Sequence, residues 1–368
     1  MSRSLTSDDI IRALMAVLRE PVDRSYPLPP YETPSQWASV CEQALRDMAA
    51  RGMFSLRDRE GTSLAKILLR AARSEVAPSL ASVPGKVRML GGLIRNLKDP
   101  GRINQGHKGT CAVTSLESFL AERQPAEYAR LVSTLITPEG SVTLASGATM
   151  RRDESALVWS RTEAWRSPVS RLFQVAAMER AYPDLDYRNT IDAHFQAGNA
   201  ADGSINTGTG VDLKAFDTLL QELTGQEWET LSRASAQAAA TLARLGLDIS
   251  GVADLARDGW PIVTRSLAAG DGVFVTLNTG DLEIDLDPEQ FPYVLPHKVR
   301  VLSFDDVADR VFYEDPLDPT ESWIPGVETK VEDDCGRCSM SRNDFCKLMD
   351  ELSYLPVHYQ PSASAPAE

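Results

Sequence analysis

A cysteine at position 111 stands at the end of a short turn that contains two glycines. The turn from Gln105 to Cys111 reads Gln-Gly-His-Lys-Gly-Thr-Cys, and the apolar residues Val113, Leu116 and Leu120 follow at helical spacing. Cys111 is therefore predicted in the first turn of a helix, where unpaired backbone N–H groups and the positive end of the helix dipole favour a thiolate. Such a thiolate is a candidate nucleophile. The competing interpretation is a cysteine that only packs within the helix.

A cysteine nucleophile needs a base and a group that orients the base, and the chain has four histidines. His297 begins an alternating segment that reaches Phe304, and residues 307–313 form a second one, so the two segments are predicted to pair as a hairpin. The second strand would return Asp315 to the start of the first strand, beside His297. Asp315 is thus expected to orient the imidazole. Neighbouring acidic residues remain alternatives, namely Asp306, Asp309 and Glu314.

The other three histidines are not assigned to the chemistry. His107 lies four positions before Cys111 on the tight turn, and a side chain there should point elsewhere. His194 and His358 are interpreted as surface or packing residues.

The turn resembles the signature of the papain-like cysteine peptidases, which reads Gln-Gly-x-x-Gly-x-Cys and is followed by a helix. Gln105 and Cys111 match its polar positions, and both glycines match as well. The resemblance implies that the side chain of Gln105 and the backbone N–H of Cys111 form an oxyanion hole. One such donor stabilises the transition state by about 3 kcal/mol in comparable enzymes. Thr110 and Ala112 stand where the commonest papain signature has a second cysteine and an aromatic residue, which indicates a divergent, bacterial-type branch.

Helical patterns precede strand patterns along the chain, which predicts an α+β fold. The resemblance implies the papain-like two-lobed form of that class, with a helical lobe that carries Cys111 and an antiparallel sheet lobe that carries His297 and Asp315. Residues 1–100 are interpreted as a helical N-terminal region for support, docking or a prosegment-like role. Residues 101–359 are predicted to form the catalytic domain, and residues 360–368, rich in Pro, Ala and Ser, a disordered tail.

The individual elements follow from periodicity and from breaks at glycine and proline. Ser7 is predicted to cap a first helix over the charged segment that ends at Glu20. Cys111 and His297 lie further apart than the about 130 to 150 residues quoted for papain-type enzymes. Insertions are therefore expected at 138–167 or at 226–258. Further helices are expected at Trp37–Met53, Leu64–Val76, Val87–Leu97, Ala126–Ile136, Val169–Arg180 and 213–223, a hairpin at 139–150, and strands at Pro261–Leu267, Val273–Leu277, His297–Phe304 and Val307–Tyr313.

Cys335 and Cys338 form a close pair near the end of the chain, with Cys346 and His358 further on. A structural zinc site normally needs two close ligand pairs, whereas here the second pair is widely split and Cys346 falls within an expected helix, Arg342–Leu352. A loop with incidental cysteines is the favoured interpretation over a zinc site or a redox pair. No metal ion and no cofactor are predicted.

Composition limits the classes of function. The chain has 368 residues, 43% of them hydrophobic, and a net charge of -14, which argues against nucleic-acid binding because phosphate attraction dominates such affinity. No segment approaches the roughly 18 to 20 apolar residues that span a bilayer, and the start lacks a secretory signal pattern. A cytoplasmic location is expected. Delivery by a non-classical secretion system, as for bacterial effectors or toxins, is left open.

The sequence thus predicts a thiol hydrolase that cleaves peptide or isopeptide bonds in a protein or peptide substrate. Cys111, His297, Asp315 and Gln105 are its expected catalytic residues. Two alternatives remain open. One is transglutaminase-like acyl transfer or glutamine deamidation, which uses the same Cys-His-Asp order. The other is a catalytically dead papain-like scaffold that serves as a binding module. The sequence does not decide the oligomeric state.

Overall fold

Helices occupy the first half of the chain and most strands the second half, so the structure is a mixed helix and sheet fold, as predicted. The structure is a computed structural model, and it describes residues 5–21, 33–81, 85–106, 108–157, 166–196, 210–234, 255–278, 296–317, 327–333 and 336–356. The described helices are α1 (Ser7–Leu18), α2 (Pro34–Ala50), α3 (Leu64–Arg73), α4 (Pro78–Ala81), α5 (Gly85–Lys98), α6 (Cys111–Arg123), α7 (Pro125–Ile136), α8 (Pro168–Ala181), α9 (Leu213–Thr224), α11 (Leu255–Ala269) and α12 (Arg342–Leu348).

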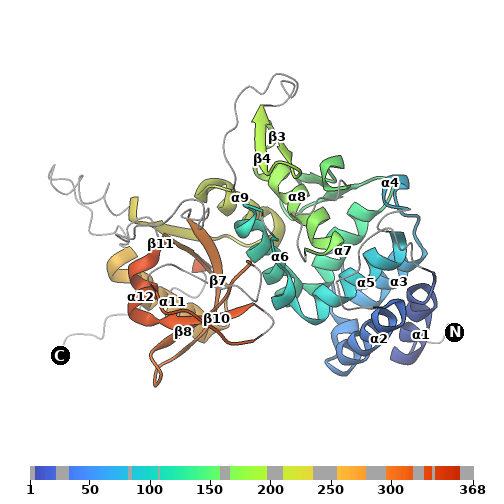
Figure 1. The fold of residues 1–368 in the computed structure, drawn as a ribbon, viewed down its shortest axis with the longest axis horizontal. Helices are drawn as coiled ribbons and strands as arrows, with labels where there is room; N and C mark the ends of the chain where they lie inside the picture. The colour runs from blue at the N-terminus through green and yellow to red at the C-terminus, as the bar shows by residue number, and fades with distance from the viewer. Residues whose placement is uncertain are drawn as a thin grey trace.

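Seven strands form one antiparallel sheet in the order β5-β11-β6-β7-β8-β10-β9. The helices α1 to α5, α7 and α8 gather on one side of the molecule and this sheet on the other, with α6 between them (Figure 1). The strands of the sheet are β5 (Glu229–Ser232), β6 (Val273–Leu277), β7 (His297–Asp305), β8 (Arg310–Glu314), β9 (Lys330–Val331), β10 (Arg337–Ser341) and β11 (Met349–Tyr354), and the two short hairpins are β1 (Ser141–Thr143) with β2 (Thr149–Arg151) and β3 (Leu185–Arg188) with β4 (Ala193–Gln196).

Alternation along the strands gives the sheet two different faces. Val273, Val275 and Val299 belong to a core shared with α11 and α12. Phe274 of β6 points to the opposite face and joins the core of the helical half. The sheet is therefore covered by helices on both faces, and α6 lies on the face of Phe274.

The N-terminal helices share one continuous core with the helices that follow. Leu14 of α1 and Leu68 of α3 belong to the same cluster of buried residues as Leu116 of α6 and Phe173 of α8. The boundary expected near residue 100 thus does not coincide with a break in the core. The division into an N-terminal region and a catalytic domain stays a prediction.

The first helix is capped one residue earlier than the sequence suggested. Thr6, not Ser7, is the N-cap of α1. The Thr6 hydroxyl accepts the backbone N–H of Asp9 at 3.2 Å, and the Asp9 carboxylate accepts the backbone N–H of Thr6 at 3.1 Å. Thr6 is the N-cap in place of Ser7 because Asp9 stands three residues after Thr6, which completes a reciprocal capping box.

The strand predicted at Pro261–Leu267 is wrong, because this segment lies within α11. The β-branched Ile262 and Val263 favoured a strand. In the structure they are buried together with Leu255 at helical spacing, while Pro261 lies on the exposed side of the helix. Tertiary packing of the buried face therefore overrides both local strand propensity and the proline.

Two further element boundaries differ from those predicted, one at the end of α12 and one at the start of β8. The helix expected over Arg342–Leu352 stops at Leu348, and β11 begins at Met349 and pairs with both β5 and β6. The second strand of the β7–β8 hairpin starts at Arg310, because Val307 lies in the turn and is 98% exposed. The other expected helices and the hairpin at 139–150 are confirmed, with ends shifted by a few residues.

Candidate active site

Cys111 is the first residue of α6, as predicted, and its side chain is half-buried. It follows the nucleophile loop, defined here as residues 104–110, of which 107 lies outside the described residues. Gly106 of this loop has a positive φ of 60°, which a glycine adopts without strain. The loop therefore delivers the chain sharply into the helix at Cys111.

A polar stripe on α6 explains why Cys111 faces the sheet. Ser115 and Ser118 follow it at helical spacing. The hydroxyl of Ser115 donates to the backbone carbonyl of Lys298 on β7 at 3.1 Å, and that of Ser118 donates to the carboxylate of Glu314 on β8 at 2.6 Å. Each contact lies on the face of α6 that carries Cys111, so the helix presents its sulfur to the start of β7.

The start of β7 carries His297, and the residue after β8 is Asp315. His297 Nε2 lies 2.8 Å from Asp315 Oδ1. The same Oδ1 accepts the backbone N–H of Leu317 at 2.9 Å, and Asp315 is only 3% exposed. The prediction that the β7–β8 hairpin brings Asp315 beside His297 is confirmed.

The imidazole of His297 also contacts the Cys111 thiol. The imidazole is hydrogen-bonded to the Cys111 thiol, and the backbone N–H of Lys298 also bonds the sulfur. Because Asp315 occupies Nε2, Nδ1 is the nitrogen left for the sulfur. Sulfur, imidazole and carboxylate thus form one chain of contacts, from the first residue of α6 to the end of β8.

The contacts among Cys111, His297 and Asp315 favour a negative charge on the sulfur and a positive charge on the imidazole. Burial opposes a charged sulfur, but the hydrogen bond and charge of His297, with the N–H and charge of Lys298, outweigh it and lower the pKa of the Cys111 thiol. Burial likewise opposes a charged imidazole, yet the charge and hydrogen bond of Asp315, with the contribution of Cys111, raise the pKa of His297 to about 10. These contacts therefore favour the thiolate form of Cys111 and the imidazolium form of His297 over the forms of the isolated groups.

The three acidic alternatives to Asp315 lie elsewhere. Glu314 accepts from Arg300 at 2.9 Å, and Asp309, in the β7–β8 turn, pairs with Arg342 at 2.9 Å. Asp306 is exposed in the same turn. Asp315 is thus the acidic residue that the hairpin brings to His297.

Gln105 is almost fully buried, with 3% of its surface exposed. Its Nε2 donates to the backbone carbonyl of Lys108 at 2.6 Å, which uses one of the two amide hydrogens. Its Oε1 is buried and accepts no hydrogen bond from the described residues. The backbone N–H of Gln105 donates to the carbonyl of Pro316 at 2.8 Å, so the loop is tied to the turn that follows Asp315.

The turn between β3 and β4 braces the nucleophile loop from the helical side. Lys108 Nζ donates to the backbone carbonyl of Asn189 at 2.7 Å, and the backbone N–H of Gly109 donates to Asp192 Oδ2 at 2.7 Å. Tyr187 donates its hydroxyl to the other oxygen of Asp192 at 2.5 Å. Sequence reasoning missed these braces, because nothing local links residues 187–192 to the loop.

A second missed group is buried behind α6. Glu117 is completely buried, and its carboxylate accepts from the hydroxyl of Tyr128 at 2.6 Å and from Gln174 Nε2 at 2.8 Å. Burial raises the pKa of Glu117 to about 7, although hydrogen bonds from Tyr128, Gln174 and Ser170 favour its charged form. The polar Gln174 within the apolar run of α8 is the sequence signal that could have indicated this network.

The remaining predicted residues take varied places. His194 is buried, with its ring centroid 4.8 Å from that of Tyr182, so its interpretation as a packing residue is confirmed. Cys338 is buried and its Sγ donates to the carbonyl of Gly336 at 3.7 Å, while Cys346 is half-buried. The interpretations of His107, Cys335 and His358, and of the tail at 360–368, lie outside the described residues.

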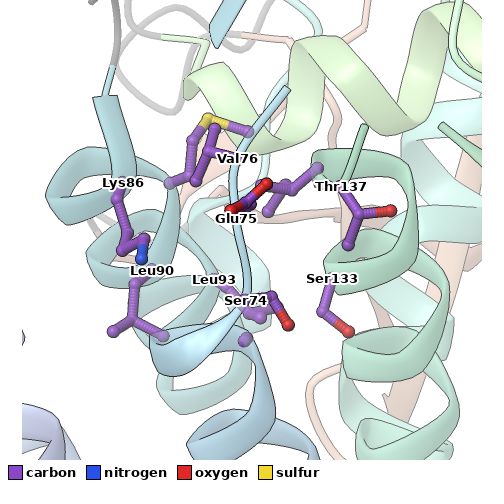
Figure 2. A pocket seen from close by; sticks show the side chains of 11 residues that line it. Ser74, Glu75, Val76, Lys86, Leu90, Leu93, Ser133 and Thr137 are labelled. Atoms are coloured by element: carbon purple, nitrogen blue, oxygen red, sulfur yellow. The ribbon is translucent and has the colours of Figure 1, made fainter. Parts of the chain in front are cut away.

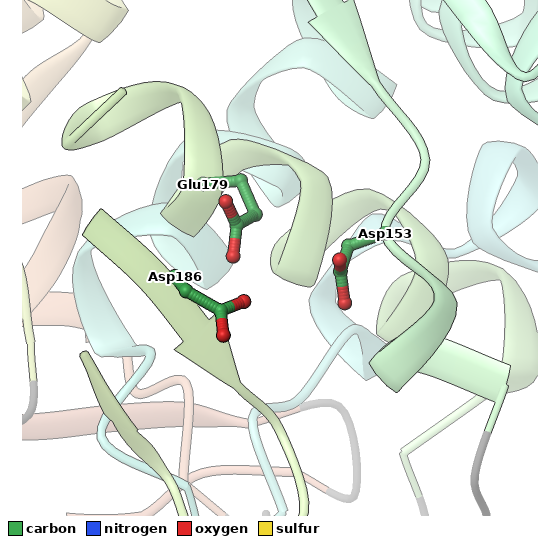
Figure 3. Close-up of side chains that lie close together, drawn as sticks. All are labelled: Asp153, Glu179 and Asp186. Atoms are coloured by element: carbon green, nitrogen blue, oxygen red, sulfur yellow. The ribbon is translucent and has the colours of Figure 1, made fainter. Parts of the chain in front are cut away.

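One acidic cluster of the described residues has the composition of a cation site. Oxygens of Asp153, Glu179 and Asp186 lie within 4.8 Å of one another (Figure 3). Burial, opposed by a backbone N–H from Tyr187 and aided by the charges of Asp153 and Asp186, raises the pKa of Glu179 to about 7. A proton on Glu179 would relieve the repulsion, so the cluster does not by itself require an ion.

A hollow in the helical half lies apart from these residues. It opens between α5, α7 and the segment after α3, and its lining includes Glu75, Lys86, Leu90 and Thr137 (Figure 2). Cys111, His297, Asp315 and Gln105 are not part of its lining. The hollow is therefore separate from the candidate active site.

The chain matches no protein-family model and no curated protein sequence. Among the described helices, none combines the length and hydropathy needed to cross a bilayer. The geometry of the site is therefore the basis on which a function can be inferred.

Proposed function

We propose that the protein is a papain-like cysteine peptidase that hydrolyses peptide or isopeptide bonds in protein substrates. The observation that supports it most directly is the 2.8 Å contact between His297 Nε2 and Asp315 Oδ1, made by a ring that also bonds the Cys111 thiol. Cys111 at the start of a helix, with His297 and Asp315 on an antiparallel hairpin, is the arrangement that the papain-like two-lobed fold would have.

The proposed reaction begins with the thiolate of Cys111. The sulfur attacks the carbonyl carbon, and the S–C bond forms as the carbonyl oxygen takes the negative charge. The second N–H of the Gln105 amide and the backbone N–H of Cys111 would stabilise that oxyanion. His297 then gives its proton to the nitrogen of the leaving amine as the C–N bond breaks, which leaves a thioester on Cys111.

Water completes the cycle. Neutral His297 takes a proton from water, the hydroxide oxygen bonds the thioester carbon, and the S–C bond breaks to release the acid and restore the thiolate and imidazolium. Asp315 holds the ring in one orientation through both steps because it binds Nε2 throughout. Neither step needs a metal ion or a cofactor.

A peptide library digested with the purified protein and read by mass spectrometry tests this proposal. New peptide termini are expected with the wild-type protein and not with Cys111→Ala, whereas Cys346→Ala, a change at another half-buried cysteine, should keep the activity. Glutamine deamidation would pass through the same kind of thioester as peptide hydrolysis. It would raise the mass of a peptide by about one unit without cutting the chain, so the mass spectra distinguish the two reactions. Cleavage that persists in Cys111→Ala would refute the assignment.

A further inference from the structure

The side chain of Gln174 on α8 lies fully buried behind the nucleophile loop. Its Nε2 donates to the backbone carbonyl of Asn104 at 3.1 Å and to the carboxylate of Glu117 at 2.8 Å. Its Oε1 accepts the hydroxyl of Thr110 at 3.1 Å. Asn104 and Thr110 are the first and last residues of the loop, so one amide holds both of its ends.

The orientation of this amide is fixed by its partners. The two hydrogens on Nε2 are used by two acceptors, the carbonyl of Asn104 and the carboxylate of Glu117. A flipped amide would turn Oε1 toward both of these oxygens and lose the two hydrogen bonds. Glu117 therefore acts as the anchor that keeps Gln174 in the orientation that also accepts from Thr110.

The first end of the loop is held from two opposite sides. The carbonyl of Asn104 and the N–H of Gln105 belong to one peptide group, and in a trans peptide these two bonds point in opposite directions. The carbonyl accepts from Gln174 on α8, and the N–H donates to Pro316 after β8 at 2.8 Å. The peptide plane that leads into Gln105 is thus clamped between the helical half and the sheet.

The second end of the loop shows an unusual use of a helix cap. A threonine at the N-cap normally accepts a backbone N–H of the first helical turn with its hydroxyl. Thr110 is the N-cap of α6 but makes no such bond, and its hydroxyl donates to Gln174 instead. The hydroxyl is therefore used to fix the residue before Cys111 and does not cover the N–H groups at the start of α6.

We propose that Gln174 is a positioning residue that sets the two oxyanion donors, the Gln105 amide and the Cys111 N–H, at the correct separation. This inference rests on the function proposed above. Gln174 touches neither sulfur nor imidazole among its hydrogen bonds, so its loss should affect steps that build an oxyanion and spare the formation of the thiolate.

Two small probes separate these effects without knowledge of the natural substrate. Iodoacetamide alkylates the thiolate: the S–C bond forms at a tetrahedral carbon and iodide leaves, with no oxyanion at any stage. p-Nitrophenyl acetate acylates it: the sulfur bonds a carbonyl carbon, an oxyanion forms, and the C–O bond then breaks to release p-nitrophenolate. Both rates are measured on the full-length protein, with the modified residue identified by mass spectrometry.

The test variant is Gln174→Met, which keeps the length of the side chain and removes its hydrogen bonds. We expect the acylation rate to fall about 10- to 100-fold, less than the about 10²- to 10³-fold that follows removal of an oxyanion donor, while the alkylation rate and its pH profile stay within about twofold. Gln124→Met is the matched control at the other end of α6, where the side chain of Gln124 donates to the Thr224 carbonyl at 3.4 Å. Both of its rates should equal those of the wild type.

A second pair of variants tests the same hydrogen bond independently, in case Gln174→Met does not fold. Thr110→Val breaks the same bridge from the loop side and should reproduce the selective loss, and Thr110→Ser keeps the hydroxyl and should restore acylation. A parallel fall of both rates in Gln174→Met and Thr110→Val, or no fall in either, would overturn the inference. A wild-type protein that neither probe modifies at Cys111 would instead refute the proposed function, and the inference with it.

Discussion

The backbone N–H of Gln105 donates to the carbonyl of Pro316 at 2.8 Å, which joins the nucleophile loop to the turn that begins with Asp315. The same turn directs the Asp315 carboxylate to His297. The placement of Gln105 relative to Asp315 is thus set by a backbone hydrogen bond and not by contact between flexible side chains.

His297→Ala should change how alkylation of Cys111 depends on pH. In the wild type the imidazolium lowers the pKa of the thiol, so the rate with iodoacetamide should reach its plateau at a lower pH than for an ordinary thiol. Without the ring, burial favours the neutral thiol, and the rate at pH 6 should fall at least about tenfold, as for an ordinary thiol of pKa about 8.5. Mass spectrometry at Cys111 gives the rate, and Cys346→Ser should leave it unchanged. Equal rates at pH 6 in wild type and His297→Ala would contradict the ion pair.

Cys111→Ala should make stability more sensitive to alkaline pH. The raised pKa of His297 stabilises the fold fully below its ordinary value of 6.5, and this contribution is lost as pH rises toward about 10. The lowered pKa of Cys111 acts in the opposite direction, because its contribution is present above the ordinary value of 9.0 and is lost as pH falls. In the wild type the two slopes offset each other between the lowered pKa of Cys111 and its ordinary value of 9.0.

Removal of the thiol leaves the slope of His297 unopposed. The unfolding free energy of Cys111→Ala should therefore fall with pH, relative to wild type, by up to about 1.4 kcal/mol per pH unit. Urea unfolding at pH 7, 8 and 9 measures it. The double variant Cys111→Ala/His297→Gln should abolish the difference in slope, and a slope that survives in the double variant would assign the effect to another group.

Arg300→Met should destabilise the contact between α6 and the sheet. Arg300 and Glu314 are both buried and lie 2.9 Å apart, and Arg300 also pairs with Glu122 of α6. Loss of the guanidinium leaves the carboxylate of Glu314 buried without its cation, which costs about 3–5 kcal/mol. Thermal and urea unfolding measure this loss, and Arg123→Met, at a more exposed arginine of α6, should change stability by less than about 0.5 kcal/mol.

A second substitution distinguishes an uncompensated charge from lost packing. Glu314→Leu combined with Arg300→Met removes both charges, so most of the stability lost in Arg300→Met should return. A double variant that is as unstable as the single one would attribute the loss to packing of the Arg300 stem.

Gly272→Ala should disturb the packing between α6 and the strand β6. A Cβ atom at position 272 would lie 2.3 Å from a ring carbon of Phe119, which itself packs on Phe274 with ring centroids 5.4 Å apart. Overpacking of this kind costs about 1–3 kcal/mol. In a double-mutant cycle, Phe119→Leu should reduce the cost of Gly272→Ala, because the smaller side chain vacates the space of the added methyl group. Strictly additive losses would show that the clash is absent.

The helix start at Cys111 and the contact between His297 and Asp315 could be predicted because each depends on a local pattern. The glycines before Cys111 and the apolar spacing after it indicate a helix start, and the alternation after His297 predicts the hairpin that returns Asp315. A hairpin brings together residues that are close in the sequence, so the approach of Asp315 to His297 needed no knowledge of the rest of the fold.

The support behind the nucleophile loop could not be predicted in this way. Gln174 contacts Asn104 and Glu117, which lie far from it in the sequence and meet it only through the packing of α8 against α6. The error at Pro261 has a related origin, since the helix α11 is decided by burial of one face against the sheet and not by the propensities of its own residues. Local sequence patterns predict single helices, strands and hairpins. The support by Gln174 and the helix α11 depend instead on packing between elements that are distant in the sequence.

The continuous core beneath α1, α3, α6 and α8 also bears on how activity could be controlled. Excision of residues 1–100 would remove α3 and α5, which pack on α7 and α8, and would so uncover part of this apolar core. The remaining fragment would then expose an apolar surface and tend to aggregate. For the proposed peptidase, activation by proteolytic removal of the front helices is therefore disfavoured.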